Sequence, residues 1–157
     1  MSYTLKQLSA DCRAAMDQDA GPAGREEVRK FISKACADTD FVAEHLGPGN
    51  TTARQVIYED DKHKFCILAH IYEGAKGSNP HDHGPSWAIY GQATGYTVMR
   101  EWNRTDDGAD DEDIALEKTS EYRLDPGQVG LFNPGVIHSI EYPDNARFDG
   151  VLCAGDS

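Results

Sequence analysis

Three histidines in two short stretches are the residues whose types and spacing could support metal chemistry. His81 and His83 flank Asp82, and His138 follows an Asn-Pro-Gly turn at 133–135. Alternate residues of a strand point to the same face, so His81 and His83 can reach one ion together, whereas Asp82 points away. Imidazole suits first-row transition metals. We therefore expect a metal site formed by His81, His83 and His138.

The elements that must position these histidines change in character near residue 51. Residues 1–50 carry apolar side chains at helical spacing, with a cap at Thr4 and breaks at 20–24 and 47–49. Residues 51–157 contain short β-forming runs between turn residues, which predicts a sandwich or barrel. The expected strands are at 56–58, 65–72, 86–92, 95–102, 116–123, 128–132, 136–142 and 148–153. We expect one mainly β domain, preceded by N-terminal α-helices that pack on it.

The composition limits the classes of partner. The chain has 157 residues and a formal net charge of -12, which argues against nucleic acid and against anionic membranes. We see no stretch apolar enough to span a bilayer, and the N-terminus is too polar for a secretory signal. The four cysteines are widely spaced, so we expect buried thiols in a reducing, cytoplasmic setting.

The two histidine stretches resemble the paired motifs of the cupin family. The first cupin motif is His-x-His followed by a ligand carboxylate and a glycine, and the second ends in Pro-x-Gly-x-x-His. The matching residues are His81, His83, Gly95, Gly127, Gly135 and His138. Asn133 takes the place of the usual proline. The resemblance implies a double-stranded β-helix, or jelly-roll barrel, over residues 51–157.

One departure narrows the resemblance to a branch of the cupins. Ala88 stands where the cupin glutamate is expected, which leaves three neutral histidines. The cysteine dioxygenase branch has this arrangement, and the runs at 52–56, 65–69 and 77–83 are similar to those of thiol dioxygenases. That alignment, with a one-residue difference in the hairpin, matches Arg54 to the arginine that pairs with the substrate carboxylate. A guanidinium can hold a carboxylate through two parallel hydrogen bonds, although a surface arginine is the alternative.

The resemblance fails on the last expected strand. Animal-type thiol dioxygenases carry a Ser-x-His-x-Tyr run there, but Cys153 and Gly155 stand near the positions of its histidine and tyrosine. The cysteine that crosslinks to that tyrosine is also replaced, by Ala88. These differences weaken the implication that cysteine is the substrate, and they leave the metal site unchanged.

Pocket residues are expected on the strand after the His-x-His stretch. Tyr90 and Gln92 share a face with Ala88, so they are predicted to line the pocket, with ordinary barrel packing as the alternative. The other histidines lack a paired context, and we expect them to be structural or solvent-exposed. They are His45, His63 and His70.

Three functions stay open at this point. The resemblance favours a mononuclear non-haem iron dioxygenase that oxidises a small anionic substrate, with a thiol acid favoured, using Fe(2+) and O2. The second is a three-histidine dioxygenase that cleaves a carbon-carbon bond, and the changed last strand favours it. The third is a cupin that binds a metal such as zinc or nickel, or a ligand, without redox chemistry. The resemblance also suggests a homodimer through edge strands.

Overall fold

The computed structural model describes residues 2–47, 54–73, 76–77, 80–81, 86–105, 115–142 and 148–156. Its helices are α1 (Leu5–Gln18), α2 (Pro22–Ala37) and α3 (Thr39–Leu46), in agreement with the helical pattern of the sequence. Thr4 caps α1 through a capping box, in which Thr4 and Gln7 each accept a hydrogen bond from the other's backbone amide. No helix in the described ranges is long and apolar enough to cross a membrane.

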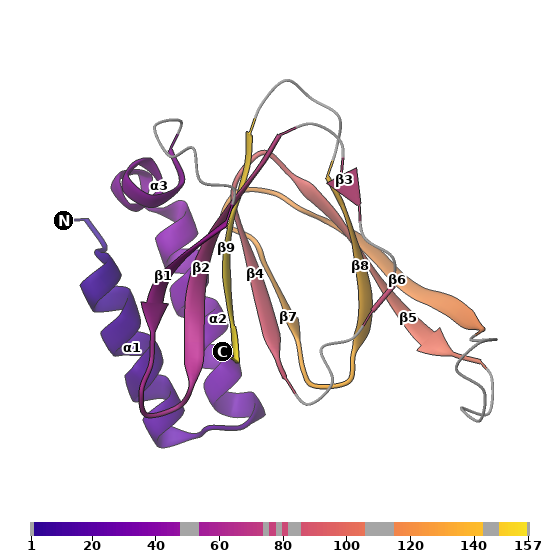
Figure 1. Ribbon diagram of the computed structural model, residues 1–157, viewed down its shortest axis with the longest axis horizontal. Helices are drawn as coiled ribbons and strands as arrows, with labels where there is room; N and C mark the ends of the chain where they lie inside the picture. The colour runs from indigo at the N-terminus through magenta and orange to yellow at the C-terminus, as the bar shows by residue number, and fades with distance from the viewer. Residues whose placement is uncertain are drawn as a thin grey trace.

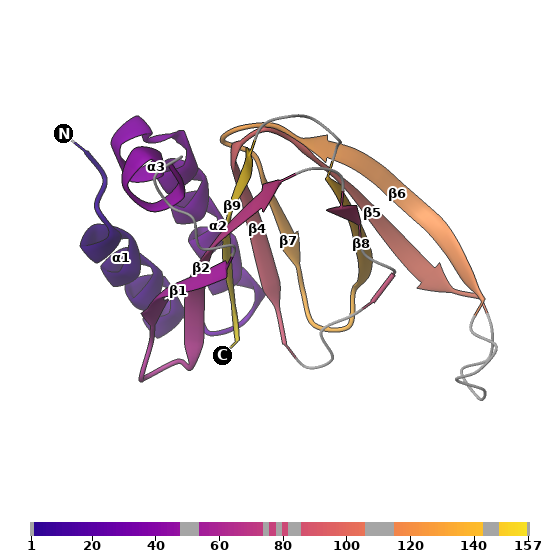
Figure 2. The same ribbon diagram turned by 45° about the horizontal axis from the view of Figure 1, so that its top comes forward.

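The strands form two antiparallel sheets. They are β1 (Arg54–Glu59), β2 (Phe65–Glu73), β3 (Lys76–Gly77), β4 (Ala88–Thr94), β5 (Thr97–Arg104), β6 (Leu116–Leu124), β7 (Val129–Phe132), β8 (Ile137–Tyr142) and β9 (Phe148–Asp156). The first sheet has the order β1-β2-β9-β4-β7, and the second has the order β3-β8-β5-β6. Figure 1 shows the helices beside the first sheet, and Figure 2 shows the second sheet on its opposite side. The predicted fold class, mainly β with N-terminal helices, is confirmed.

Strand β2 shows how the first sheet separates two apolar layers. Phe65, Ile67 and Ala69 pack with the helices in one buried cluster, whereas Cys66 and Leu68 belong to a second cluster between the sheets. This division follows from the two-residue repeat of a strand. The helices therefore cover the outer face, and the inner face is left for the candidate site.

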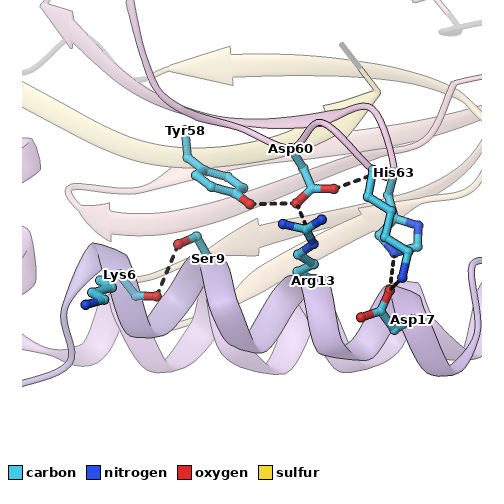
Figure 3. A network of polar contacts seen from close by, with 8 residues as sticks. Lys6, Ser9, Arg13, Asp17, Tyr58, Asp60 and His63 are labelled. Carbon is cyan, nitrogen blue, oxygen red and sulfur yellow. Dashed lines mark hydrogen bonds and ion pairs between the residues drawn. The ribbon is translucent and has the colours of Figure 1, made fainter.

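A polar network joins α1 to the turn between β1 and β2 (Figure 3). The Asp60 carboxylate accepts hydrogen bonds from the Tyr58 hydroxyl at 2.6 Å and the His63 amide at 2.7 Å, and Arg13 lies 3.7 Å away. Burial alone would raise the pKa of Asp60, but these partners together lower it. Asp17 of α1 contacts the His63 ring at 2.8 Å. The hairpin is thereby held against the helical layer.

Local expectations from the sequence agree with the structure in most places. The turn expected at 60–63 joins β1 to β2, and all four cysteines are buried thiols. Strand β5 continues to Arg104, so it takes in the first residue of the loop expected at 104–113. Most of that expected loop, from residue 106 onward, lies outside the described residues.

Candidate metal centre and the adjoining cavity

His81 and His138 lie side by side. The strand that carries His138 returns beside His81, and the two residues form an antiparallel bridge. The His81 amide donates to the His138 carbonyl at 2.9 Å, and the His138 amide donates to the His81 carbonyl at 2.8 Å. Such a pair presents both side chains on one face, and the two ring centroids are 4.6 Å apart. His83 lies outside the described residues, so its place in the site stays a prediction.

Aromatic side chains enclose the imidazole of His138, which is 0% exposed. Phe132 of β7 stacks on it with ring centroids 4.1 Å apart and an interplanar angle of 16°. Tyr90 of β4 meets it edge-on at 5.7 Å. Both aromatic rings come from the first sheet and reach across the interior to the second. The orientation of His138 is therefore set by packing before any ligand binds.

The turn before β8 is tied to the helical layer. Gly135 has φ +84°, a left-handed conformation that favours glycine, and the Val136 amide donates to the Asn133 carbonyl at 3.2 Å. Arg25 of α2 is only 8% exposed, and its Nε donates to Asn133 Oδ1 at 2.9 Å. Asparagine at the position of the usual cupin proline thus supplies an acceptor for Arg25. The sequence offered no signal for this contact, because 108 residues separate the two partners.

A cavity of about 340 Å³ adjoins the histidine pair. Tyr90 and Ile140 line it, Tyr90 also packs against His138, and Ile140 is the next residue on the same face of β8. Its polar lining residues are Arg54, Cys66, His70, Ser86, Tyr90 and Cys153. The predicted pocket residues Arg54 and Tyr90 therefore share one cavity, which Ala88 also lines without offering a metal ligand.

Arg54 and His70 form one wall of this cavity. They are register partners on the antiparallel strands β1 and β2, so their side chains lie on the same face. The register shifts between Val56 and Tyr58, which inserts one extra residue into β1. Arg54 is exposed and marks the open end of the cavity, whereas His70 is partly buried.

Burial keeps two ionisable groups of the cavity neutral. Burial and then the charge of Arg54 lower the pKa of His70 to about 4, so this imidazole is neutral at pH 7. Burial raises the pKa of Cys153, so its thiol stays protonated. Among the residues that line the cavity, Arg54 is therefore the one that carries a charge at neutral pH.

The structure corrects the predicted place of Gln92 and adds His70 to the cavity. Gln92 follows Tyr90 on the same face of β4 but does not line this cavity. Its amide nitrogen donates to the Thr94 carbonyl at 2.7 Å, and its oxygen accepts from the Thr97 hydroxyl at 2.7 Å, so it closes the turn between β4 and β5. His70, which the sequence predicted to be structural or solvent-exposed, is partly buried and also lines the cavity. The alternation of Cys66, Leu68 and His70 could have indicated its direction.

The described donors fit a divalent transition metal in part. The His81 and His138 rings are close enough for one nitrogen of each to reach a common ion at about 2 Å. Among the described residues, no three histidine, cysteine or acidic side chains gather at metal-binding distance, and His83 is not one of these residues.

A larger cavity, of about 720 Å³, lies between α2, α3 and the turn that follows β4. The residues that line it are mostly apolar and include no histidine and no charged side chain. Ionisable and hydrogen-bonding groups converge on the smaller cavity instead. The smaller cavity is therefore the candidate substrate pocket.

Comparisons with known proteins bear on the fold. No family model matches the chain, and no curated protein sequence matches it. The chain is similar to the cupin domain of Schizosaccharomyces pombe Cnp3, with a TM-score of 0.51 and 9% identity over 71% of both chains. It is also similar to a Bacillus halodurans protein, with a TM-score of 0.51 and 10% identity over 68% of this chain and 70% of that one. With its two antiparallel sheets, the chain thus has a cupin fold preceded by three α-helices.

Proposed function

We propose that this chain is a mononuclear non-haem iron dioxygenase of the cysteine dioxygenase-like type. It oxidises a small thiol acid with O2 at a site formed by His81, His83 and His138. The observation that carries the proposal is the bridge between His81 and His138 beside a cavity that Arg54 opens. A neutral ligand set leaves the two charges of Fe(2+) uncompensated, which suits an anionic substrate.

The cavity supports a small acid as the substrate. Its volume of about 340 Å³ is at the lower end for a ligand pocket. Arg54 binds the carboxylate, since a guanidinium presents two parallel donors to a planar anion. The apolar side chains of Leu68 and Ile140 line the space between the sheets and limit the entry of water. Charge at the mouth and an apolar interior together orient the thiol inward.

The metal and the protein have separate tasks in this proposal. Bound iron supplies the redox chemistry that joins dioxygen to the substrate. Tyr90 and Phe132 hold the ring of His138, and Arg25 holds the turn that precedes it. Arg54 fixes the acid end of the substrate, which reduces the number of poses that the thiol can take.

Elemental analysis combined with oxygen uptake tests the proposal. The protein is purified without added metal, loaded with Fe(2+) and given mercaptoacetate, 3-mercaptopropanoate and cysteine, with 2-mercaptoethanol as the thiol that lacks a carboxylate. We expect oxygen uptake with at least one thiol acid, and a product that has gained two oxygen atoms. No uptake with any thiol by the iron-loaded protein would refute the thiol dioxygenase.

Three variants and one matched control test which residues the activity needs. His81→Ala and His138→Ala should each lose metal and oxygen uptake, because each removes one of three ligands. His63→Ala removes a histidine from the turn between β1 and β2 and should keep both. Arg54→Gln should raise the KM for thiol acids more than it lowers kcat, because it removes a binding contact.

One observation favours a second function. Cys153 and Gly155 line the cavity on β9, where animal-type thiol dioxygenases carry a histidine and a tyrosine. This wall therefore lacks both the imidazole and the phenol. Oxygen uptake with acetylacetone or catechol, but with no thiol, would assign a carbon-carbon bond-cleaving dioxygenase. Tightly held zinc without turnover would instead assign a cupin without redox chemistry.

A further inference from the structure

His70 lines the cavity, and the proposed iron site gives it no role. It lies on β2, directly opposite Arg54 of β1, and both side chains line the cavity. Side chains of such a cross-strand pair have Cβ atoms about 5 Å apart, which is within the span of one carboxylate bound between them. The two residues therefore form one wall at the open end of the cavity.

His70 follows two residues of an apolar cluster in the inward row of β2. The preceding inward residues of β2, Cys66 and Leu68, belong to the apolar cluster between the sheets. Burial and the neighbouring charge of Arg54 lower the pKa of His70 to about 4, so both disfavour the charged imidazole. A neutral imidazole still offers one N–H donor and one acceptor nitrogen.

We propose that His70 is a specificity-determining residue that donates a hydrogen bond to the substrate carboxylate held by Arg54. This inference deepens the proposed function and rests on it for the identity of the substrate. Arg54 supplies the charge, and the His70 N–H supplies a donor at a fixed position on the adjacent strand. The pair favours a carboxylate over a neutral amide or alcohol, because the anion pairs with the charge of Arg54 and has two equivalent oxygens to accept from both groups.

The register of the sheet limits the length of the substrate. His70 of β2 pairs with Val151 of β9, and Tyr90 of β4 pairs with Cys153 of β9. Tyr90 therefore lies two strands across the sheet from His70 and two residues further along the strand direction. Strand spacing and rise place the Cα atoms of His70 and Tyr90 about 12 Å apart. The side chains of His70 and Tyr90 both line the cavity on this face of the sheet. This separation leaves room for a short acid between Arg54 and the Tyr90 ring, which contacts His138.

Binding of matched probes by NMR tests the proposal without requiring turnover. Propanoate and propanamide have the same shape, and only propanoate is charged. The Cε1–H resonance of His70 is assigned by its absence in His70→Leu. We expect this resonance to shift with propanoate and with 3-mercaptopropanoate, and to stay in place with propanamide. An unmoved resonance at saturating carboxylate would overturn the proposal.

Variants separate hydrogen bonding from shape. His70→Leu should weaken carboxylate binding about tenfold at a temperature where the variant is folded, as expected for one hydrogen bond to a charged group. His70→Gln keeps an N–H donor and should recover most of the affinity. His63→Leu, the matched control outside the cavity, should bind as the parent does. Wild-type affinity in His70→Leu, or equal loss in His70→Leu and His70→Gln, contradicts the proposed contact.

The two proposals can fail separately. If carboxylate binding depends on His70 but the iron-loaded protein takes up no oxygen, the role of His70 is supported and the dioxygenase is refuted. If the protein takes up oxygen with thiol acids but their KM is unchanged in His70→Leu, the dioxygenase is supported and the role of His70 is refuted.

Discussion

Replacing Arg25 by methionine tests whether the helical layer positions the candidate metal centre. Methionine keeps an apolar stem of similar length and removes the guanidinium that donates to Asn133 Oδ1 at 2.9 Å. A hydrogen bond from a charged donor contributes about 2 kcal/mol, and the contact from Nη1 to the Ala20 carbonyl, at 3.4 Å, adds little. For a chain of this size, that loss lowers the melting temperature by roughly 4–8 °C.

The same substitution should weaken metal binding. The contact holds the turn from which β8 starts, and His138 lies five residues after Asn133. Changes in groups that orient a ligand typically cost about 10-fold to 100-fold in metal affinity. We expect about a 10-fold loss for Arg25→Met, measured with Co(2+) against a competing chelator well below the melting temperature.

Controls separate this contact from a general loss of stability. Arg29→Met lies on the same helix and removes an exposed ion pair with Glu26, so it should cost less than about 0.5 kcal/mol and leave metal affinity unchanged. Arg25→Met and Asn133→Ala should show a coupling energy of about 1.5 kcal/mol in a double-mutant cycle. Fully additive losses, or unchanged Co(2+) affinity in folded Arg25→Met, would refute the reasoning.

Three further predictions concern the layers that support the site. Asp60→Asn should lower the free energy of unfolding in urea by about 2 kcal/mol, because it weakens the acceptor of the partly buried Tyr58 hydrogen bond, whereas Asp61→Asn, at an exposed position, should change little. The partners of Asp60 lower its pKa, so their stabilisation is present above the unfolded pKa of about 3.9 and is lost as the pH falls through the folded pKa. The free energy of unfolding should therefore fall less steeply in Asp60→Asn than in the parent as the pH is lowered from about 6 to about 3. Equal slopes would contradict this assignment. Gly91→Ala should cost about 1–3 kcal/mol, because the new Cβ would lie 2.6 Å and 2.8 Å from two α2 side chains, and Gly130→Ala, with 3.5 Å to its nearest atom, is the matched control.

The histidine motifs were predictable because they depend on local chemistry. A turn at 133–135 followed by a strand carries His138 into the interior, and this needs only the residues of that segment. The cap at Thr4 and the turn at 60–63 are likewise local, and both occur where the sequence predicts them. Side-chain alternation also assigned Tyr90 to the inward face of its strand.

Contacts between distant segments were not predictable in the same way. The order β2-β9-β4 brings Cys153 beside Leu68 and Tyr90, although β9 is the last strand of the chain. Side-chain alternation assigned Gln92 to the correct face of β4, but it did not show that the cavity ends before Gln92. The cavity ends there because Gln92 bonds to Thr94 and Thr97 at the turn between β4 and β5. The Arg25 contact with Asn133 depends on how α2 sits on the sheet.

His81 and His138 illustrate this division. Residue type and turn chemistry indicate that each can bind a metal, because those properties reside in a few consecutive residues. The bridge between them, and the pairing of Arg54 with His70, depend on strand register. Register is determined by the burial of whole faces and by the bulge in β1, which no short segment specifies. The sequence therefore names the groups that could react, and the tertiary structure decides which of them share a cavity.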